Sequence, residues 1–135
     1  MRVLGFMTGT SLDAVDMAVI DTDGAEILGL GPTGEKKLDP AVRALVEAAT
    51  ADALAWAAGA PEPSSFAPAA TAVAAEHVAA GLAFMTRHRL LPQDLTLIGL
   101  QGQTVLHAPT TPRGAWAARC SWWTPTQWRA ASAYR

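Results

Sequence analysis

Short apolar runs separated by turn residues predict three strands at the start of the chain. Apolar side chains dominate positions 2–7, 15–21 and 25–30, and each run is too short for a helix and rich in strand-forming residues. Between the second and third runs, Asp23-Gly24 is a dipeptide typical of tight hairpins. The pattern therefore predicts three consecutive antiparallel strands.

Apolar residues at helical spacing predict two helices in the middle of the chain. Asp39 is suited to cap the first helix and Pro40 to begin it, and the helix should end near Gly59 and Pro61. A second, longer helix is predicted over residues 68–89. The predicted apolar stripes run through Val42, Leu45, Val46, Ala49 and Ala53 in the first helix and through Val73, Val78, Gly81, Leu82 and Met85 in the second.

The turn between the first two predicted strands contains small and hydroxyl-bearing residues. Backbone amides can approach a phosphate oxygen only where side chains are absent or small, as at Gly5, Gly9, Thr10 and Ser11. The hydroxyls of Thr8, Thr10 and Ser11 add further donors. These residues make the turn a candidate phosphate-binding loop.

Two acidic residues, Asp13 and Asp16, follow this turn. They would repel a bare phosphate unless a cation or a water lay between, so the pattern suggests Mg²⁺ together with a nucleotide. The turn is not a Walker loop, because that pattern needs a Lys before its Ser or Thr. An ordinary β-turn, in which Gly, Thr, Ser and Asp are common for conformational reasons, explains the composition equally well.

A second polar turn follows a buried, parallel strand predicted at residues 95–100. Ligands of open α/β sheets collect at the carboxyl ends of strands, so the Gly-Gln-Thr sequence at 102–104 is a candidate binding site. Neutral groups such as those of Gln103 and Thr104 suit sugar hydroxyls. A polar turn that only links two strands is the alternative.

Together these two turns resemble motifs of the anhydro-N-acetylmuramic acid kinases, members of the actin/hexokinase/Hsp70-like superfamily. Residues 7–16 read M-T-G-T-S-L-D-A-V-D against the family pattern M-S-G-T-S-x-D-G-V-D, with Thr8 and Ala14 as differences. Residues 98–109 follow I-G-x-H-G-Q-T-V-x-H-x-P, with Gln101 in place of the first His. The resemblance covers residues 2 to about 112.

The resemblance implies an α/β fold and assigns the site residues. The fold would be an incomplete actin-like, ribonuclease H-like domain, with a mixed sheet of three antiparallel strands plus a parallel strand and two helices. The implied ATP-binding loop consists of Gly9, Thr10, Ser11, Leu12, Asp13, Ala14, Val15 and Asp16. Asp13 and Asp16 would organise Mg²⁺, and Gln103, Thr104 and His107 would bind the amino sugar.

The activity implied by the resemblance is an ATP-dependent opening of the 1,6-anhydro ring of N-acetylmuramic acid during peptidoglycan recycling. Water attacks the anomeric carbon while the freed O6 takes the γ-phosphoryl group. The catalytic Asp of the family belongs to a motif beyond the Gly-Gln-Thr turn, where this sequence no longer follows the family, so no catalytic residue is assigned. We therefore expect the chain alone to be inactive. The alternative is a non-catalytic half-domain with at most weak nucleotide or saccharide binding.

The amino-acid composition limits the expected binding partners and the expected cellular compartment. A formal net charge of −2 and the absence of a basic cluster argue against nucleic acid as a partner. The single Cys120 excludes an internal disulfide and fits a reducing cytoplasm. The sequence contains no uninterrupted apolar run of about 18 residues, the length that would predict a membrane span. We expect a cytoplasmic protein that binds ATP and a small amino sugar, and the resemblance implies that full-length relatives are homodimers.

Three further features receive simpler interpretations. Residues 113–135, with four Trp and no ordering pattern, predict a shifted reading frame or a disordered tail after a domain at 1–112, and an aromatic stacking surface is the alternative. The G-x-G-x-x-G at 29–34 does not lead directly into a helix and is interpreted as a loop or bulged strand end. For His77 and His88, a partly buried or surface position is expected, since neither has metal-ligand spacing to another ligand.

Overall fold

The structure is a computed structural model that describes residues 1–57, 60–105 and 121–122. The chain divides into two units. The sheet unit consists of residues 1–38 and 76–101, and the helical unit of residues 39–75 together with the segment from 102 onward.

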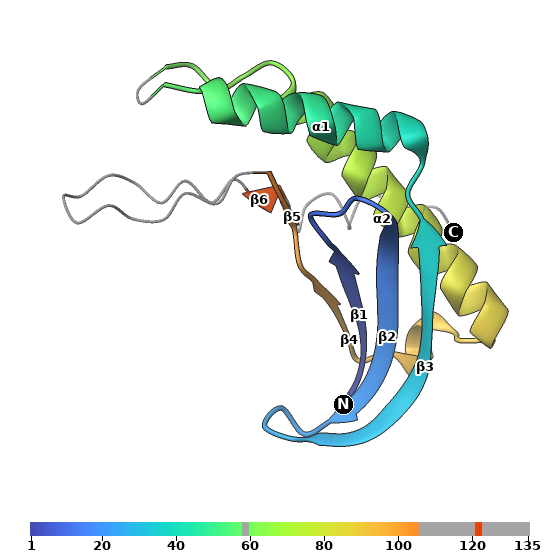
Figure 1. Cartoon of the computed structure of the whole chain (residues 1–135). Coiled ribbons are helices and arrows are strands. Elements are labelled where there is room, and N and C mark those ends of the chain that lie inside the picture. Colours follow the sequence, from blue (N-terminus) through green and yellow to red (C-terminus); the bar gives the residue numbers. More distant parts are fainter. Residues whose placement is uncertain (58–59, 106–120, 123–135) are drawn as a thin grey trace. The chain divides into compact units, whose positions relative to one another are not determined.

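Four strands form the sheet of the sheet unit: β1 (Arg2–Thr8), β2 (Ala14–Thr22), β3 (Ile27–Lys37) and β4 (Leu97–Leu100). Their order is β3-β2-β1-β4, with β2 antiparallel to both β1 and β3, and β4 parallel to β1 (Figure 1). The predicted mixed sheet of three antiparallel strands and one parallel strand is therefore confirmed.

The C-terminal half of α2 (Phe66–His88) packs against one face of this sheet. Along β1 the buried side chains alternate, at Leu4, Phe6 and Thr8, as expected for a strand with one covered face. A Cβ atom built at Gly81 of α2 would lie 2.8 Å from the ring of Phe6, so only glycine allows this close approach of helix and sheet. The predicted helix face is thus correct at Gly81.

The predicted end of the third strand, at Leu30, was wrong, because β3 continues to Lys37. The pairing of β2 with β3 shifts register between Ala18 and Ile20, which marks a bulge in the hairpin. Gly31 lies at this bulge, where a Cβ atom would come within 2.9 Å of Val19. The G-x-G-x-x-G sequence therefore belongs to a strand with a bulge, rather than to a loop or to the end of a strand, and it does not lead into a helix.

Helix α1 (Pro40–Ala55) of the helical unit begins as predicted. The Asp39 side chain accepts a hydrogen bond from the amide of Ala41 at 2.7 Å, which caps the first turn. The helix ends four residues before the expected Gly59, because Trp56 adopts an extended conformation. Helix α2 in turn begins at Phe66, two residues before the expected position.

The apolar stripes were predicted only in part. Val46, Ala49 and Ala53 of α1 and Val73 of α2 are buried as expected, whereas Leu45 is 40% and Leu82 63% exposed. The buried face of α2 instead includes the polar residues Glu76 and His77. A hydrophobicity pattern does not select polar residues, so it shifted the predicted stripe towards Leu82.

By length and composition, α2 could cross a membrane, and it is the one such helix in the described part of the chain. Its middle, however, contains Glu76 and His77, which bond to the strand residues Lys36 and Thr8. Such contacts are those of a core helix that packs against a sheet, and a core helix passes the same test of length and composition.

The remaining elements are short. A 3₁₀ turn (η1, Pro92–Asp94) precedes β4, which begins two residues later than predicted. In the helical unit, β5 (Gln103–Thr104) pairs antiparallel with β6 (Ser121–Trp122). Apart from β6, the predicted anomalous tail lies outside the described residues, and so its assignment stays a prediction.

Candidate functional site

The candidate phosphate loop, residues 9–13, connects the end of β1 to the start of β2. It lies where β1 and the parallel strand β4 both present their carboxyl ends, since the amide of Gln101 donates to the carbonyl of Phe6 at 3.2 Å. Ligands of open α/β sheets bind at this kind of edge. The position of the loop therefore agrees with a binding role.

The loop is closed by a tight turn. The amide of Leu12 donates to the carbonyl of Gly9 at 3.3 Å, and Leu12 itself has φ of 53°, in the left-handed region. For a residue with a side chain this conformation costs about 1–2 kcal/mol. Burial of the Leu12 side chain offsets this cost and anchors the turn to the core.

Three consecutive backbone amides in the loop are available to a ligand. None of the described residues accepts a hydrogen bond from the amides of Gly9, Thr10 or Ser11. Gly9 is half-buried, and Thr10 and Ser11 are exposed. A Cβ atom at Gly9 would lie 3.1 Å from the Ser11 hydroxyl oxygen, so glycine keeps the turn compact. Successive amides of this kind form a concavity that suits phosphate oxygens.

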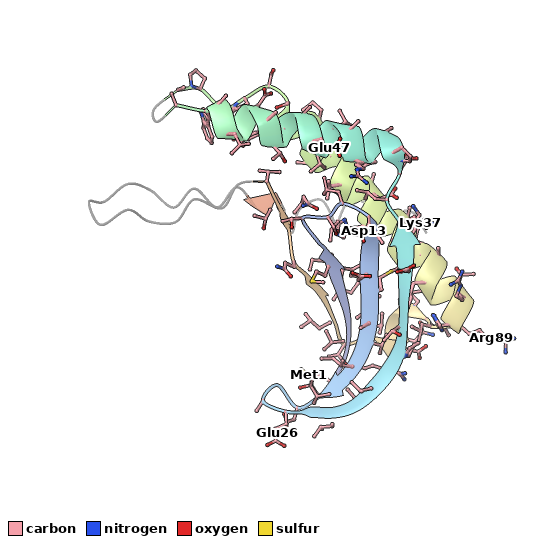
Figure 2. The ribbon with its side chains drawn as sticks, in the orientation of Figure 1. Met1, Asp13, Glu26, Lys37, Glu47 and Arg89 are labelled. Carbon is pink, nitrogen blue, oxygen red and sulfur yellow. The ribbon has the colours of Figure 1, made fainter. Side chains whose placement is uncertain are left out.

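Asp13 is fixed through both its side chain and its backbone. Its Oδ1 atom accepts from the Ser11 hydroxyl at 2.6 Å and from the amide of Ala14 at 3.0 Å. The carbonyl of Asp13 accepts from the amide of Leu38 at 2.9 Å. Figure 2 shows Asp13 and Lys37 at the same end of the sheet, in agreement with the pairing of Ala14 with Lys37. The carboxylate of Asp13 is therefore held in one orientation beside the three amides.

Asp16 has different surroundings. It lies on β2 opposite Met7 and Glu35, and it is exposed. Because side chains alternate along a strand, Asp16 faces away from Met17, which is buried beneath α2. Within residues 1–57, 60–105 and 121–122, no group of three or more His, Cys, Asp or Glu residues could hold a metal by itself. Mg²⁺ commonly takes one or two carboxylates and completes its shell with water and phosphate oxygens, so the metal role of Asp13 and Asp16 stays a prediction.

The sequence did not predict the partner of Thr8. The Thr8 hydroxyl and Nε2 of His77 lie 2.7 Å apart, with exposed fractions of 6% and 1% for the two residues. The His77 ring also lies 6.2 Å from the ring of Phe6, measured between centroids. Two expectations are thereby corrected. His77 is fully buried rather than partly exposed, and the Thr8 hydroxyl points into the core rather than serving as a phosphate donor.

A partly buried ion pair lies next to this contact. Lys36 of β3 bonds to Glu76 of α2, the residue before His77. Lys36 pairs in the sheet with Val15, which follows the loop. One helical turn of α2 therefore contacts the strands on both sides of the loop. The signal in the sequence was an acid and a histidine interrupting an alanine-rich apolar helix.

Ala14, where the family pattern has glycine, fits the structure without strain. Among the described residues other than glycine, positive φ occurs at Leu12 and Arg89, and Ala14 is an extended residue at the start of β2. The backbone at this position is therefore compatible with a Cβ atom.

The predicted sugar-binding residues belong to the helical unit. Gln103 is fully buried, its Nε2 donates to the carbonyl of Thr104 at 3.1 Å, and its Oε1 has no partner among the described residues. Thr104 is half-buried, and His107 lies outside the described residues. A buried carbonyl oxygen without a donor is unfavourable, so Gln103 has an acceptor that a ligand hydroxyl could satisfy.

The mixed sheet and its first loop are those of part of an actin-like α/β domain. The family model described as anhydro-N-acetylmuramic acid kinase matches residues 1–116. The chain belongs to this family.

Individual relatives agree with the family match, and each carries the name anhydro-N-acetylmuramic acid kinase. The protein from Phenylobacterium zucineum is 58% identical over 107 residues, which cover 79% of this chain and 29% of the relative. The protein from Caulobacter vibrioides is 54% identical over 114 residues, covering 84% and 31%. That from Bradyrhizobium diazoefficiens is 39% identical over 109 residues, covering 81% and 30%. The chain thus spans about 30% of the length of these relatives.

Proposed function

We propose that this chain supplies the first phosphate-binding loop of an ATP-dependent kinase that acts on 1,6-anhydro-N-acetylmuramic acid. The observation that carries the proposal is the set of three consecutive amides, from Gly9 to Ser11, with no acceptor among the described residues. They lie at the carboxyl end of β1, in a loop whose sequence matches the first motif of the family.

The loop residues have separate roles in this proposal. The amides of Gly9, Thr10 and Ser11 and the exposed Thr10 hydroxyl donate hydrogen bonds to phosphate oxygens. Asp13 and Asp16 accept hydrogen bonds from water molecules of the metal shell or bind the metal directly. Mg²⁺, when bound, would neutralise part of the phosphate charge. Leu12, Ala14 and Val15 shape the loop through their buried side chains.

The sugar site in this proposal consists of Gln103, Thr104 and His107. Supporting evidence is the unpaired Oε1 of Gln103, which can accept a hydrogen bond from a sugar hydroxyl. In the reaction, water adds to the anomeric carbon, the bond between that carbon and O6 breaks, and O6 accepts the γ-phosphoryl group. The products are N-acetylmuramic acid 6-phosphate and ADP, as peptidoglycan recycling in the cytoplasm would require. The base that removes the proton from water is not assigned to a residue of this chain.

The alternative is a non-catalytic half-domain that binds nucleotide or saccharide weakly. We propose that the 135 residues alone do not transfer phosphate, since they span about 30% of the relatives' length and catalysis requires both substrates to be positioned together. In full-length relatives we expect homodimers that carry the complete activity.

One experiment on the purified chain tests both parts of the proposal. The chain is incubated with ATP, Mg²⁺ and 1,6-anhydro-N-acetylmuramic acid, sugar phosphate is measured by mass spectrometry, and ATP binding is measured by calorimetry. We expect saturable, Mg²⁺-dependent ATP binding without turnover, whereas the full-length relative from Phenylobacterium zucineum should turn over in the same assay. Turnover by the 135-residue chain would contradict its proposed inactivity, and a lack of ATP binding would contradict the phosphate loop.

A further inference from the structure

We infer that His77 is a positioning residue for the phosphate loop, acting through Thr8. This inference rests on the proposed nucleotide binding by residues 9–16, which comprise the loop at 9–13 and the first residues of β2. His77 holds the last residue of β1 in place from the interior, and the amides of the next three residues are thereby presented outward.

The geometry of the pair supports this role. Thr8 immediately precedes the first available amide, and its hydroxyl lies 2.7 Å from Nε2 of His77 in a buried environment. A buried hydroxyl without a partner is unfavourable, so the pair favours the side-chain rotamer of Thr8 that faces α2. Thr8 is the last residue of β1, so the backbone that enters the loop at Gly9 starts from a residue fixed against the core.

The same turn of α2 also restrains the far side of the loop. Glu76, next to His77, bonds to Lys36, and Lys36 pairs with Val15 just after the loop. The chain beyond Lys36 also contacts the loop directly, through the bond from the amide of Leu38 to the carbonyl of Asp13. The loop is therefore held at its beginning through His77 and at its end through Glu76.

An apolar side chain at position 77 would fill the same space but would not bond to Thr8. The role of His77 therefore depends on its hydrogen bond to Thr8 and not on the volume of its side chain alone. The conservative variants are Thr8→Ser, which keeps the hydroxyl, and His77→Gln, whose terminal amide can reach the same region. The disruptive variants are Thr8→Val and His77→Leu, which keep approximate volume and remove the hydrogen bond.

The test measures two properties of the full 135-residue chain, with urea unfolding as a check of stability. The first is the set of amide NMR chemical shifts of Gly9, Thr10 and Ser11 without ligand. The second is the dissociation constant for ATP with Mg²⁺. Thr86→Val is the matched control, because Thr86 is exposed on the same helix and its hydroxyl donates to the carbonyl of Leu82 in its own helix.

Thr8→Val and His77→Leu should each shift the three amide resonances and weaken ATP binding about tenfold, the size expected for loss of one buried hydrogen bond. The double variant should bind no more weakly than the single variants, because both changes remove the same contact. Thr8→Ser and His77→Gln should retain most of the affinity, and Thr86→Val should match the unaltered chain.

A purely structural role gives a different result. In that case Thr8→Val would lower the free energy of unfolding while the ATP affinity and the amide shifts of Thr10 and Ser11, which are not adjacent to the substitution, stayed unchanged, and this would overturn the inference. If His77→Leu fails to fold, Thr8→Val decides the question, because it only replaces a hydroxyl with a methyl group. If the unaltered chain does not bind ATP, the proposed function fails, and the amide shifts of Thr10 and Ser11 in Thr8→Val against those in Thr86→Val still decide whether His77 positions the loop.

Discussion

The Ser11 hydroxyl donates a hydrogen bond of 2.6 Å to Oδ1 of Asp13, two residues further along the same loop. The same oxygen accepts from the amide of Ala14. Hydrogen bonds to a carboxylate are among the stronger ones in proteins, so this pair gives an exposed loop a defined shape. It also holds an acid, which would otherwise repel phosphate, in one orientation beside three donor amides.

Replacing Ser11 with Ala should loosen the loop. The variant loses the hydrogen bond to Asp13 and one hydroxyl donor, so we expect ATP affinity to fall about threefold to tenfold, with unfolding free energy lower by about 0.5–1.5 kcal/mol. Calorimetry and urea unfolding measure the two effects. Ser64→Ala, an exposed serine of the helical unit, is the control and should change neither quantity. Unchanged affinity in Ser11→Ala would show that this hydrogen bond does not organise the binding loop.

The metal assignment predicts a change in Mg²⁺ dependence. In Asp13→Asn and Asp16→Asn, one carboxylate near the phosphates loses its charge, and the Mg²⁺ concentration for half-maximal ATP binding should rise about tenfold for the residue that orients the metal. Titration of Mg²⁺ at fixed ATP measures this value. Glu26→Gln, at the exposed tip of the β2–β3 hairpin, serves as the control. If neither Asp variant differs from Glu26→Gln, the metal does not depend on these two carboxylates.

Changing Ala14 to the glycine of the family pattern should destabilise the chain. Ala14 begins β2 without positive φ, so glycine gains no conformational advantage and loses more entropy on folding, at a cost of about 0.5–1 kcal/mol. Urea unfolding of the two chains gives the difference. A more stable Ala14→Gly variant would mean that alanine is strained at this position.

The ion pair between Lys36 and Glu76 should contribute more to the free energy of unfolding than the exposed neighbouring residue Lys37 does. Lys36→Met removes the partner of a nearly buried carboxylate, and we expect the unfolding free energy to fall by about 1–3 kcal/mol. Lys37→Met alters the exposed adjacent residue and should stay within about 0.5 kcal/mol. Equal effects of the two substitutions would contradict the assigned role of Lys36.

The elements that the sequence predicted well have local signals. Asp39 and Pro40 mark a helix start through their own chemistry, and the first two strands follow from apolar runs and turn residues. The extent of β3 was missed because residues 33–37 pair with β2 beyond the bulge at Gly31 and Pro32, and this pairing overrides the local preference of those two residues.

The candidate site likewise has a part that the sequence predicts and a part that it does not. The loop from Gly9 to Asp16 could be recognised because its small residues, hydroxyls and acids are contiguous. The contacts that hold the loop could not be recognised from the sequence, since Thr8 and His77 are 69 residues apart and Lys36 and Glu76 are 40 residues apart. Which polar residue of α2 faces which strand depends on the packing of helix on sheet, and no local pattern specifies it.

An NMR titration of the ¹⁵N-labelled chain with ATP and Mg²⁺ tests the central claim most directly. If residues 9–11 hold the phosphates, their amide resonances should show the largest shifts, and adenosine without phosphates should not reproduce them. Shifts located elsewhere in the chain, or equal shifts with adenosine, would contradict the assignment of this loop to phosphate binding.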